Sequence, residues 1–158
     1  MELSIDGSLN HIDFSAAHFI PTIEKCSRLH GHNYYLKVSV SGEPLEGILI
    51  DYGLLKTACR KSVDAIDHRI IVPRSSRYST CDIDGDYCKV SYNGKTFVFP
   101  VSDVYFLDKE MSSSELLSES ILDGLKGEIF SQKNIRRITV CVFESPGQGA
   151  CSEASKDE

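Results

Sequence analysis

Apolar and polar residues alternate along several stretches of the chain. This alternation predicts β-strands, because successive side chains of a strand point to opposite faces. Residues 2–18 read as extended, with a turn or bulge near residues 7–10, where the alternation changes phase. Residues 32–40 predict a second strand with one apolar face, and residues 135–143 predict another strand late in the chain.

Two segments carry the spacing of apolar positions that is typical of helices. Residues 47–67 begin as a short apolar strand and continue as a helix, for which Asp51 is a suitable N-cap. The sequence Ser-Ser-Ser-Glu at residues 112–115 predicts a capping box that opens a second helix, which ends near Phe130.

A hairpin and a polar loop are predicted between the two helices. Residues 87–99 form the hairpin signal, because the Asn93-Gly94 pair at their centre suits the two positive-φ positions of a type I′ turn. Residues 73–86 read as a polar loop.

The order of these elements predicts an α+β fold with both helices on one face of an antiparallel sheet. We expect a single domain over residues 1–150, with a hairpin insertion near residues 74–104. The small and charged residues 151–158 are expected to form a frayed tail.

Composition and charge exclude several classes of function. The 158 residues include 17 Lys and Arg and 23 Asp and Glu, and the formal net charge of −6 argues against a nucleic-acid-binding surface. No apolar run approaches the ~18 residues of a membrane span. The first ten residues lack the basic and apolar regions of a signal peptide, so we expect a cytoplasmic protein. Its six cysteines are then expected to be free thiols, with Cys59 and Cys141 as small core residues.

The stretch CSRLHGHNY, residues 26–34, concentrates side chains that bind metals. His30 and His32 share a face if this stretch is extended, and His18 ends the preceding strand in the matching phase. Three imidazoles with one open position are typical of a catalytic zinc site. Cys26 is an alternative fourth ligand, which would close the site and make it structural.

Several motifs occur in an order that resembles the 6-pyruvoyltetrahydropterin synthase and 6-carboxytetrahydropterin synthase superfamily. They are FSAAH (14–18), C-SRL-HGHNY (26–34), GILIDYGLLK (47–56), IDH (66–68), SSSE (112–115) and FESP (143–146). The resemblance implies the tunnelling fold, in which two helices cover one face of an antiparallel sheet. It also implies that subunits join by their sheet edges into trimeric barrels, and that two trimers stack as a homohexamer.

The resemblance implies a role for each residue of the motifs. The three zinc ligands fall on His18, His30 and His32, and the catalytic cysteine falls on Cys26. The remaining positions are the catalytic pair Asp67 and His68, the pterin-binding Glu144, and the serines that flank the pterin pocket, Ser113 and Ser114. Because Asp67 and His68 are adjacent in sequence, they can interact only if the backbone turns there, and a partner from another subunit is an alternative.

The spacing C-x3-HGH is similar to that of the bacterial and archaeal 6-carboxytetrahydropterin synthases. The implied reaction converts 7,8-dihydroneopterin triphosphate to 6-carboxy-5,6,7,8-tetrahydropterin, with loss of triphosphate and acetaldehyde, and the product feeds 7-deazaguanine synthesis toward queuosine or archaeosine. The alternatives are a 6-pyruvoyltetrahydropterin synthase, a dihydroneopterin aldolase, and a catalytically silent oligomer that binds zinc or pterin. Relatives often finish with one more strand after the glutamate, and here we expect that strand to be very short, or the pterin pocket to be less closed.

Overall fold

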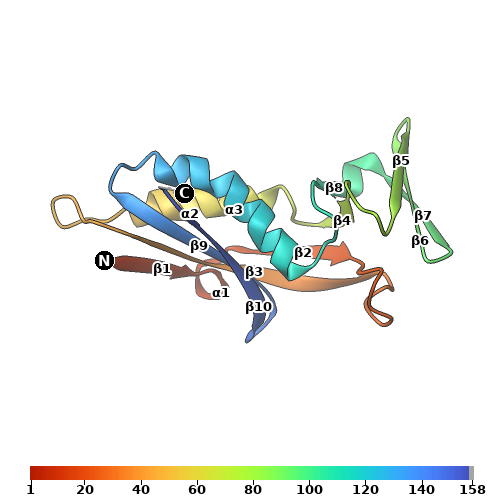
Figure 1. The fold of residues 1–158 in the computed structure, drawn as a ribbon, viewed down its shortest axis with the longest axis horizontal. Helices are drawn as coiled ribbons and strands as arrows, with labels where there is room; N and C mark the ends of the chain where they lie inside the picture. The colour runs from red at the N-terminus through yellow and green to blue at the C-terminus, as the bar shows by residue number, and fades with distance from the viewer. Residues whose placement is uncertain (157–158) are drawn as a thin grey trace.

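The computed structural model describes residues 1–156, and its main body is a sheet of seven strands covered by helices (Figure 1). The sheet order is β10-β9-β3-β2-β4-β8, and β1 also pairs with β3. The strands are β1 (Glu2–Asp6), β2 (Asp13–His18), β3 (His30–Gly42), β4 (Arg69–Pro73), β8 (Val104–Leu107), β9 (Ile135–Ser145) and β10 (Gln148–Ser155).

Strand β3 organises the sheet, because its 13 residues pair with three other strands. Its first half pairs with β2, its second half pairs with β1, and β9 lies along its other edge. These pairings are antiparallel, as predicted. The sheet is nevertheless mixed, because β4 is parallel both to β2 and to β8.

Helices α2 (Tyr52–Asp64) and α3 (Ser114–Phe130) lie on the same face of the sheet, whereas the short α1 (Gly7–Asn10) forms the turn between β1 and β2 (Figure 1). The predicted N-cap of α2 is confirmed, since the Asp51 carboxylate accepts a hydrogen bond of 2.9 Å from the Leu54 amide. The main core fills the space between sheet and helices with fully buried side chains such as Phe14, Leu36, Leu55, Leu117 and Ile138.

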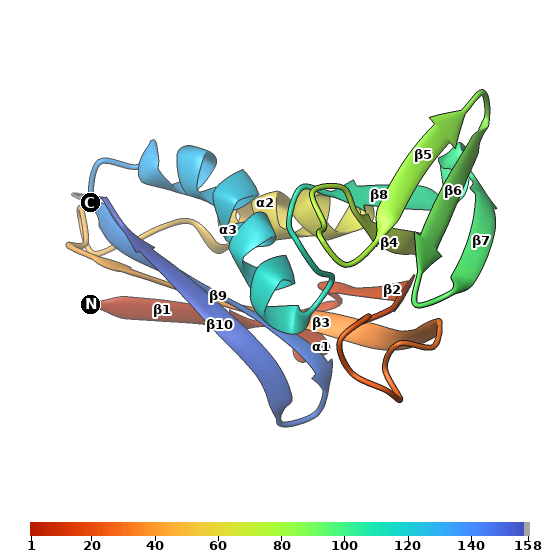
Figure 2. The same ribbon diagram turned by 45° about the vertical axis from the view of Figure 1, so that its right-hand side comes forward.

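The segment between β4 and β8 forms a separate three-stranded sheet, which Figure 2 shows beside the main body. It contains β5 (Thr80–Asp84), β6 (Tyr87–Tyr92) and β7 (Lys95–Pro100), and a 3-10 turn (Val101–Asp103) leads to β8. The predicted hairpin is confirmed, because Asn93 and Gly94 have φ values of 47° and 72°. A second apolar cluster packs this sheet against the main body through Phe19, Val72, Cys88, Val90, Tyr92 and Val104.

Two local predictions between the helices are wrong. Residues 73–86 are not only loop, because β5 pairs with β6; its residues lack apolar alternation since most of them are exposed at the edge of the small sheet. The predicted capping box does not form either. Helix α3 begins at Ser114, and the Ser113 side chain makes no capping bond within the described residues, while the Ser112 hydroxyl donates to the Phe19 carbonyl at 2.9 Å.

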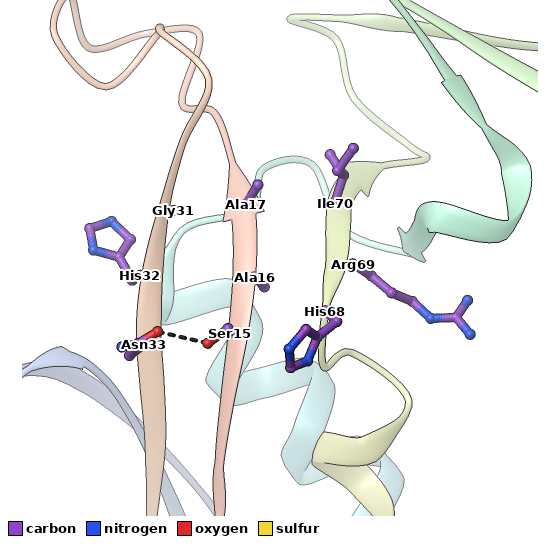
Figure 3. Close-up of a pocket in the computed structure, with 9 residues that line it drawn as sticks. All are labelled: Ser15, Ala16, Ala17, Gly31, His32, Asn33, His68, Arg69 and Ile70. Atoms are coloured by element: carbon purple, nitrogen blue, oxygen red, sulfur yellow. Dashed lines mark hydrogen bonds between the residues drawn. The ribbon is translucent and has the colours of Figure 1, made fainter.

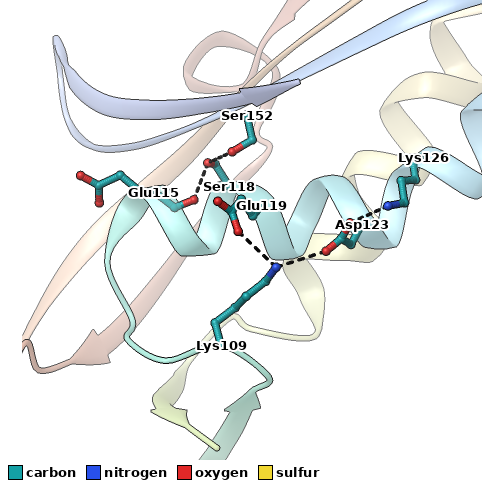
Figure 4. A network of polar contacts seen from close by, with 7 residues as sticks. All are labelled: Lys109, Glu115, Ser118, Glu119, Asp123, Lys126 and Ser152. Atoms are coloured by element: carbon teal, nitrogen blue, oxygen red, sulfur yellow. Dashed lines mark hydrogen bonds and ion pairs between the residues drawn. The ribbon is translucent and has the colours of Figure 1, made fainter. Parts of the chain in front are cut away.

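The predicted frayed tail is wrong for residues 151–155, which belong to the eight-residue strand β10. This strand has no strong hydrophobic signal, since it is held by pairing with β9 and by polar contacts. The Ser118 and Ser152 hydroxyls lie 2.7 Å apart between α3 and β10 (Figure 4). The Lys156 ammonium donates to the Phe130 carbonyl at 2.7 Å. Residues 157 and 158 lie outside the described residues.

The expectation that all cysteines are free is also wrong. Cys141 and Cys151 lie opposite each other on β9 and β10 and form a disulfide, because β10 is longer than expected and its pairing with β9 brings them together. The other four cysteines are free thiols, and Cys59 is buried in the core as predicted.

Lys109 holds the segment between β8 and α3 against helix α3. Its ammonium lies 3.2 Å from the Glu119 carboxylate and 3.3 Å from the Asp123 carboxylate, which are both on α3 (Figure 4). This anchor fixes the path of a short segment that includes Ser112. None of the described helices has the length and apolar character that a membrane crossing requires.

Candidate metal centre

The three predicted histidine ligands converge at the paired ends of β2 and β3. His18 lies directly opposite His30 in the antiparallel register, and His32 follows two residues later on the same face. The imidazole centroids are 4.5 to 5.1 Å apart, and one nitrogen from each ring lies within 4.8 Å of the others. This spacing suits three ligands of one ion.

Two of the three rings are oriented by backbone carbonyls. The Nδ1 atom of His18 lies 2.8 Å from the Ser112 carbonyl, and Nδ1 of His30 lies 2.7 Å from the Arg28 carbonyl. A carbonyl oxygen only accepts hydrogen bonds, so both Nδ1 atoms carry the proton and donate. Each Nε2 atom therefore keeps a free lone pair, which is the arrangement that supports histidine ligands of metals.

His18 is the most constrained of the three ligands. Its side chain is buried, and its Nε2 atom has no hydrogen-bond partner within the described residues. Burial lowers the pKa of His18 to about 4, so the ring is neutral at physiological pH. A buried, neutral and unpaired nitrogen that faces two other imidazoles fits a metal ion.

Cys26 is not part of this donor cluster among the described residues, so the structure does not place it as a fourth ligand. It lies instead on the wall of a pocket of about 400 Å³ that opens beside the three histidines. The same pocket brings together other predicted site residues, namely Ser113, Ser114 and Glu144. The arrangement leaves the three histidines facing a space that a small molecule can enter.

Each wall of this pocket comes from a different part of the fold. Cys26 belongs to the segment between β2 and β3, while Ser113 and Ser114 begin α3, where backbone amides point outward and favour negative charge. Glu144 lies near the end of β9 and is half-buried. Burial, and then the charge of Glu144, raise the pKa of the nearby Tyr34.

Sequence reasoning missed three further polar or backbone positions on the pocket wall, Glu115, Gln148 and Gly149. The sequence indicates Glu115 only as part of a helix cap. Its position at the start of α3 places it on the pocket wall instead. Gln148 and Gly149 begin β10, which is longer than the very short strand expected from the sequence. The pocket thus has two carboxylates, Glu115 and Glu144, on its wall.

The Asp67 and His68 side chains do interact, as the backbone turn needed for adjacent residues is present. His68 adopts a left-handed conformation with φ of 59°, and its Nδ1 atom lies 2.8 Å from the Asp67 carboxylate. The other carboxylate oxygen of Asp67 accepts a bond of 2.8 Å from the Ser15 amide. Burial would raise the pKa of Asp67, but the Ser15 amide and His68 outweigh it and hold this pKa below its usual value.

This pair lies apart from the histidine pocket of the same chain. His68 is 83% exposed and lines an open groove with Arg69, Ser15, Asn33 and the candidate ligand His32, which Figure 3 shows between β3, β2 and β4. Residues of odd number on β2, such as Ser15, face the opposite side of the sheet from His18. Within one chain, Cys26 therefore lines one pocket with all three histidines, whereas His68 shares its groove with His32 but not with His18, His30 or Cys26.

Comparison with known proteins identifies a consistent set of relatives. A family model described as 6-pyruvoyl tetrahydropterin synthase matches residues 9–155. A protein of Methanocaldococcus jannaschii named putative 6-carboxy-5,6,7,8-tetrahydropterin synthase is 31% identical, covering 96% of this chain and 95% of the relative. The 6-carboxy-5,6,7,8-tetrahydropterin synthase of Rickettsia typhi is 30% identical over 75% of this chain and 76% of its own length.

Solved structures show the same architecture. The 6-pyruvoyltetrahydropterin synthase of Plasmodium vivax, in a form with a catalytic glutamate replaced by alanine, superposes with a TM-score of 0.90. It is 29% identical and matches 98% of each chain. This similarity confirms the predicted fold class.

Replacing His30 by alanine is expected to abolish stable binding of a divalent metal. Two remaining imidazoles hold an ion much more weakly than three. Metal per chain, measured by mass spectrometry of the purified protein, should fall from about one to a small fraction. The control is His11→Asn, which changes an exposed histidine outside the cluster and keeps a residue that tolerates its left-handed backbone. An unchanged metal content in His30→Ala would contradict the ligand assignment.

Acid is expected to destabilise the metal-free protein through His18. The pKa of His18 is about 4 in the folded protein and 6.5 as a free side chain. Between pH 4 and pH 6.5, the unfolded chain therefore binds a proton at this residue that the folded chain does not bind. This difference lowers the free energy of unfolding by about 2 to 3 kcal/mol between pH 7 and pH 4.5. Urea unfolding at the two pH values measures it. His18→Gln should show a correspondingly smaller pH dependence, and an identical dependence would rule out this role of His18.

Proposed function

We propose that this chain, which belongs to the 6-pyruvoyl tetrahydropterin synthase family, converts 7,8-dihydroneopterin triphosphate to 6-carboxy-5,6,7,8-tetrahydropterin, releasing triphosphate and acetaldehyde. The observation that carries the proposal is the single pocket that joins the three histidines with Cys26 and Glu144. Relatives that carry the 6-carboxy name, of which the chain covers most, support this product. The product would feed 7-deazaguanine synthesis, toward queuosine or archaeosine.

The metal in this proposal is zinc, which three neutral imidazoles bind while leaving a position open. His18, His30 and His32 would hold it. When bound, zinc supplies a Lewis acid for the side-chain oxygens of the substrate. The carbonyls of Ser112 and Arg28 keep two of the rings in the tautomer that this binding requires.

Cys26 is proposed as the general base. It is half-buried on the wall of the pocket, beside the ligands but outside their donor cluster, so its sulfur is not committed to the metal. As a thiolate it would accept a proton from the substrate side chain.

Glu144 is proposed to hold the pterin ring. A pterin edge presents an exocyclic amine and a ring N–H side by side, and one carboxylate accepts both, which fixes the orientation of the ring. Its half-buried position near the end of β9, at the pocket wall, suits this task better than a solvated strand end would. Ser113 and Ser114 are proposed to flank the ring from the start of α3.

The acid of the reaction is proposed to be His68 of a partner subunit, held by its Asp67. Within one chain this pair faces a separate, exposed groove, so an assembly is needed to bring it to the pocket. The main sheet ends in β8 and β10, and unpaired edges of this kind can be covered by a second copy. We therefore propose a homohexamer built from two trimers.

A 6-pyruvoyltetrahydropterin synthase is the second candidate, because the solved structures with a TM-score of 0.90 carry that name. Two observations favour the 6-carboxy product over it. They are the spacing of Cys26 three residues before HGH and the names of the sequence relatives. One solved neighbour is described with a catalytic glutamate, whereas Cys26 is the residue proposed for this chain.

Incubating the zinc-loaded protein with 7,8-dihydroneopterin triphosphate should yield the 6-carboxy product together with acetaldehyde, as measured by mass spectrometry. Cys26→Ala should lower turnover by about 10²-fold or more, because it removes the proposed base, and should leave the zinc content unchanged. The 6-pyruvoyl product would support the second candidate. Tight pterin binding without turnover would support a silent oligomer and contradict the proposal.

Mixing two inactive variants tests whether the pocket is shared between subunits. Cys26→Ala and His68→Ala should each be inactive alone. Unfolding them together and refolding them should restore a fraction of the activity, because some pockets then combine an intact Cys26 with an intact His68 from the partner. Wild-type protein that has been unfolded and refolded in the same way serves as the control. Activity that does not rise above that of the separately refolded variants would place both residues in one chain.

A further inference from the structure

We infer that the tip of the inserted hairpin positions the segment that carries Cys26, with Lys95 as the main positioning residue. The inference rests on the proposed function, because it assigns a role to the insertion in the placement of the proposed base. Three contacts, from Tyr92, Asn93 and Lys95, join the hairpin tip to residues 19–27.

The segment between β2 and β3 has little regular structure of its own. Four backbone hydrogen bonds fold it back on itself, and one of them runs from the Ile20 amide to the Cys26 carbonyl at 2.7 Å. The Ser27 hydroxyl adds a bond of 2.8 Å to the Glu24 carbonyl. A short loop of this kind needs contacts from outside to keep a side chain in one place.

Lys95 supplies the contact nearest to Cys26. Its ammonium donates to the Ser27 carbonyl at 2.9 Å and to the Ser27 hydroxyl at 3.3 Å, and Ser27 is buried. Hydrogen bonds from a charged donor are stronger than neutral ones. The same ammonium lies 5.5 Å from the centre of the Tyr92 ring, so two favourable partners fix its position.

Asn93 and Tyr92 hold the other end of the segment. The Asn93 amide donates to the Pro21 carbonyl at 2.7 Å, and the Tyr92 ring stacks on Phe19 with centroids 4.2 Å apart. Phe19 directly follows the ligand His18, and its carbonyl accepts the Ser112 hydroxyl. The hairpin tip thus connects the start of the segment, at the metal ligands, with its end, at Cys26.

The type I′ turn makes this reach possible. Both Asn93 and Gly94 have left-handed backbones, which fold the two strands tightly and direct the Asn93 and Lys95 side chains toward the main body. Figure 2 shows the β6–β7 turn extending to the end of β2. The tip of the insertion therefore contacts Ser27, one residue after Cys26, and Phe19, one residue after His18.

The test is the variant Lys95→Met, which keeps the length of the side chain and removes its charge. Hydrogen exchange of residues 20–28, read by mass spectrometry, should become faster, and kcat should fall about tenfold, since small displacements of a reacting group are costly. KM and zinc content should change less than about threefold. Lys95→Arg should recover most of the activity, because a charged donor is restored.

Two further variants separate this role from general destabilisation. Lys89→Met removes an exposed lysine of the same small sheet and should behave as wild type. Asn93→Gly keeps the left-handed backbone, removes the bond to Pro21 and should also accelerate exchange of residues 20–28. Unchanged exchange in Lys95→Met, or equal losses in Lys89→Met, would overturn the inference.

Failure of the proposed function would be recognised separately. If the wild-type protein turned over no pterin, the rate at which iodoacetamide labels Cys26 would replace kcat as the readout. A changed labelling rate in Lys95→Met, with Lys89→Met unchanged, would support the positioning role. Identical rates in all three proteins would overturn it.

Discussion

The register between β2 and β3 is the constraint on which the metal centre depends. It places His18 opposite His30 and puts His32 on the same face, so three residues from two strands form one cluster without help from any other element. A slip of one residue would move every side chain of one strand to the other face and would separate the imidazoles. The buried face of these strands prevents that slip, because Phe14, Tyr34 and Leu36 are fully buried in the core and would have to become exposed.

Segments outside β2 and β3 orient the histidines that the register brings together. The carbonyls of Ser112 and Arg28 select the tautomers of two ligands, and both come from segments outside the two strands. The Lys109 anchor on α3 and the bond between Ser112 and Phe19 fix the first of these segments. Lys95 contacts Ser27 in the second. The orientation of the histidine rings therefore depends on contacts with segments outside the two strands, whereas their proximity depends only on the pairing of β2 with β3.

This division explains which features the sequence could predict. Alternation in β2 and β3 and the ordered motifs indicated the histidines, the helices and the fold, because these depend on local periodicity and on nearby residues. The full length of strand β10 could not be predicted, since its polar residues are held by pairing with β9 and by Ser118 rather than by an apolar face. The disulfide of Cys141 and the positions of Gln148 and Gly149 in the pocket depend on the same pairing. The separation of His68 from Cys26 depends on the parallel placement of β4 beside β2, which a pattern of residues does not encode.

The candidate metal centre and the residues proposed to transfer protons are accordingly placed by different means. The three histidines need only the register of β2 and β3, so this cluster does not distinguish between the two candidate reactions. Under the proposed function, the product is decided by where protons are removed and returned, and hence by Cys26 and His68. Cys26 lies on a segment that Lys95 of the insertion contacts, and His68 lies on an exposed turn that, under the same proposal, acts in the pocket of a partner subunit. The proposal thus implies that changes in the insertion and in the subunit contacts alter the reaction while the fold and the three histidines stay the same.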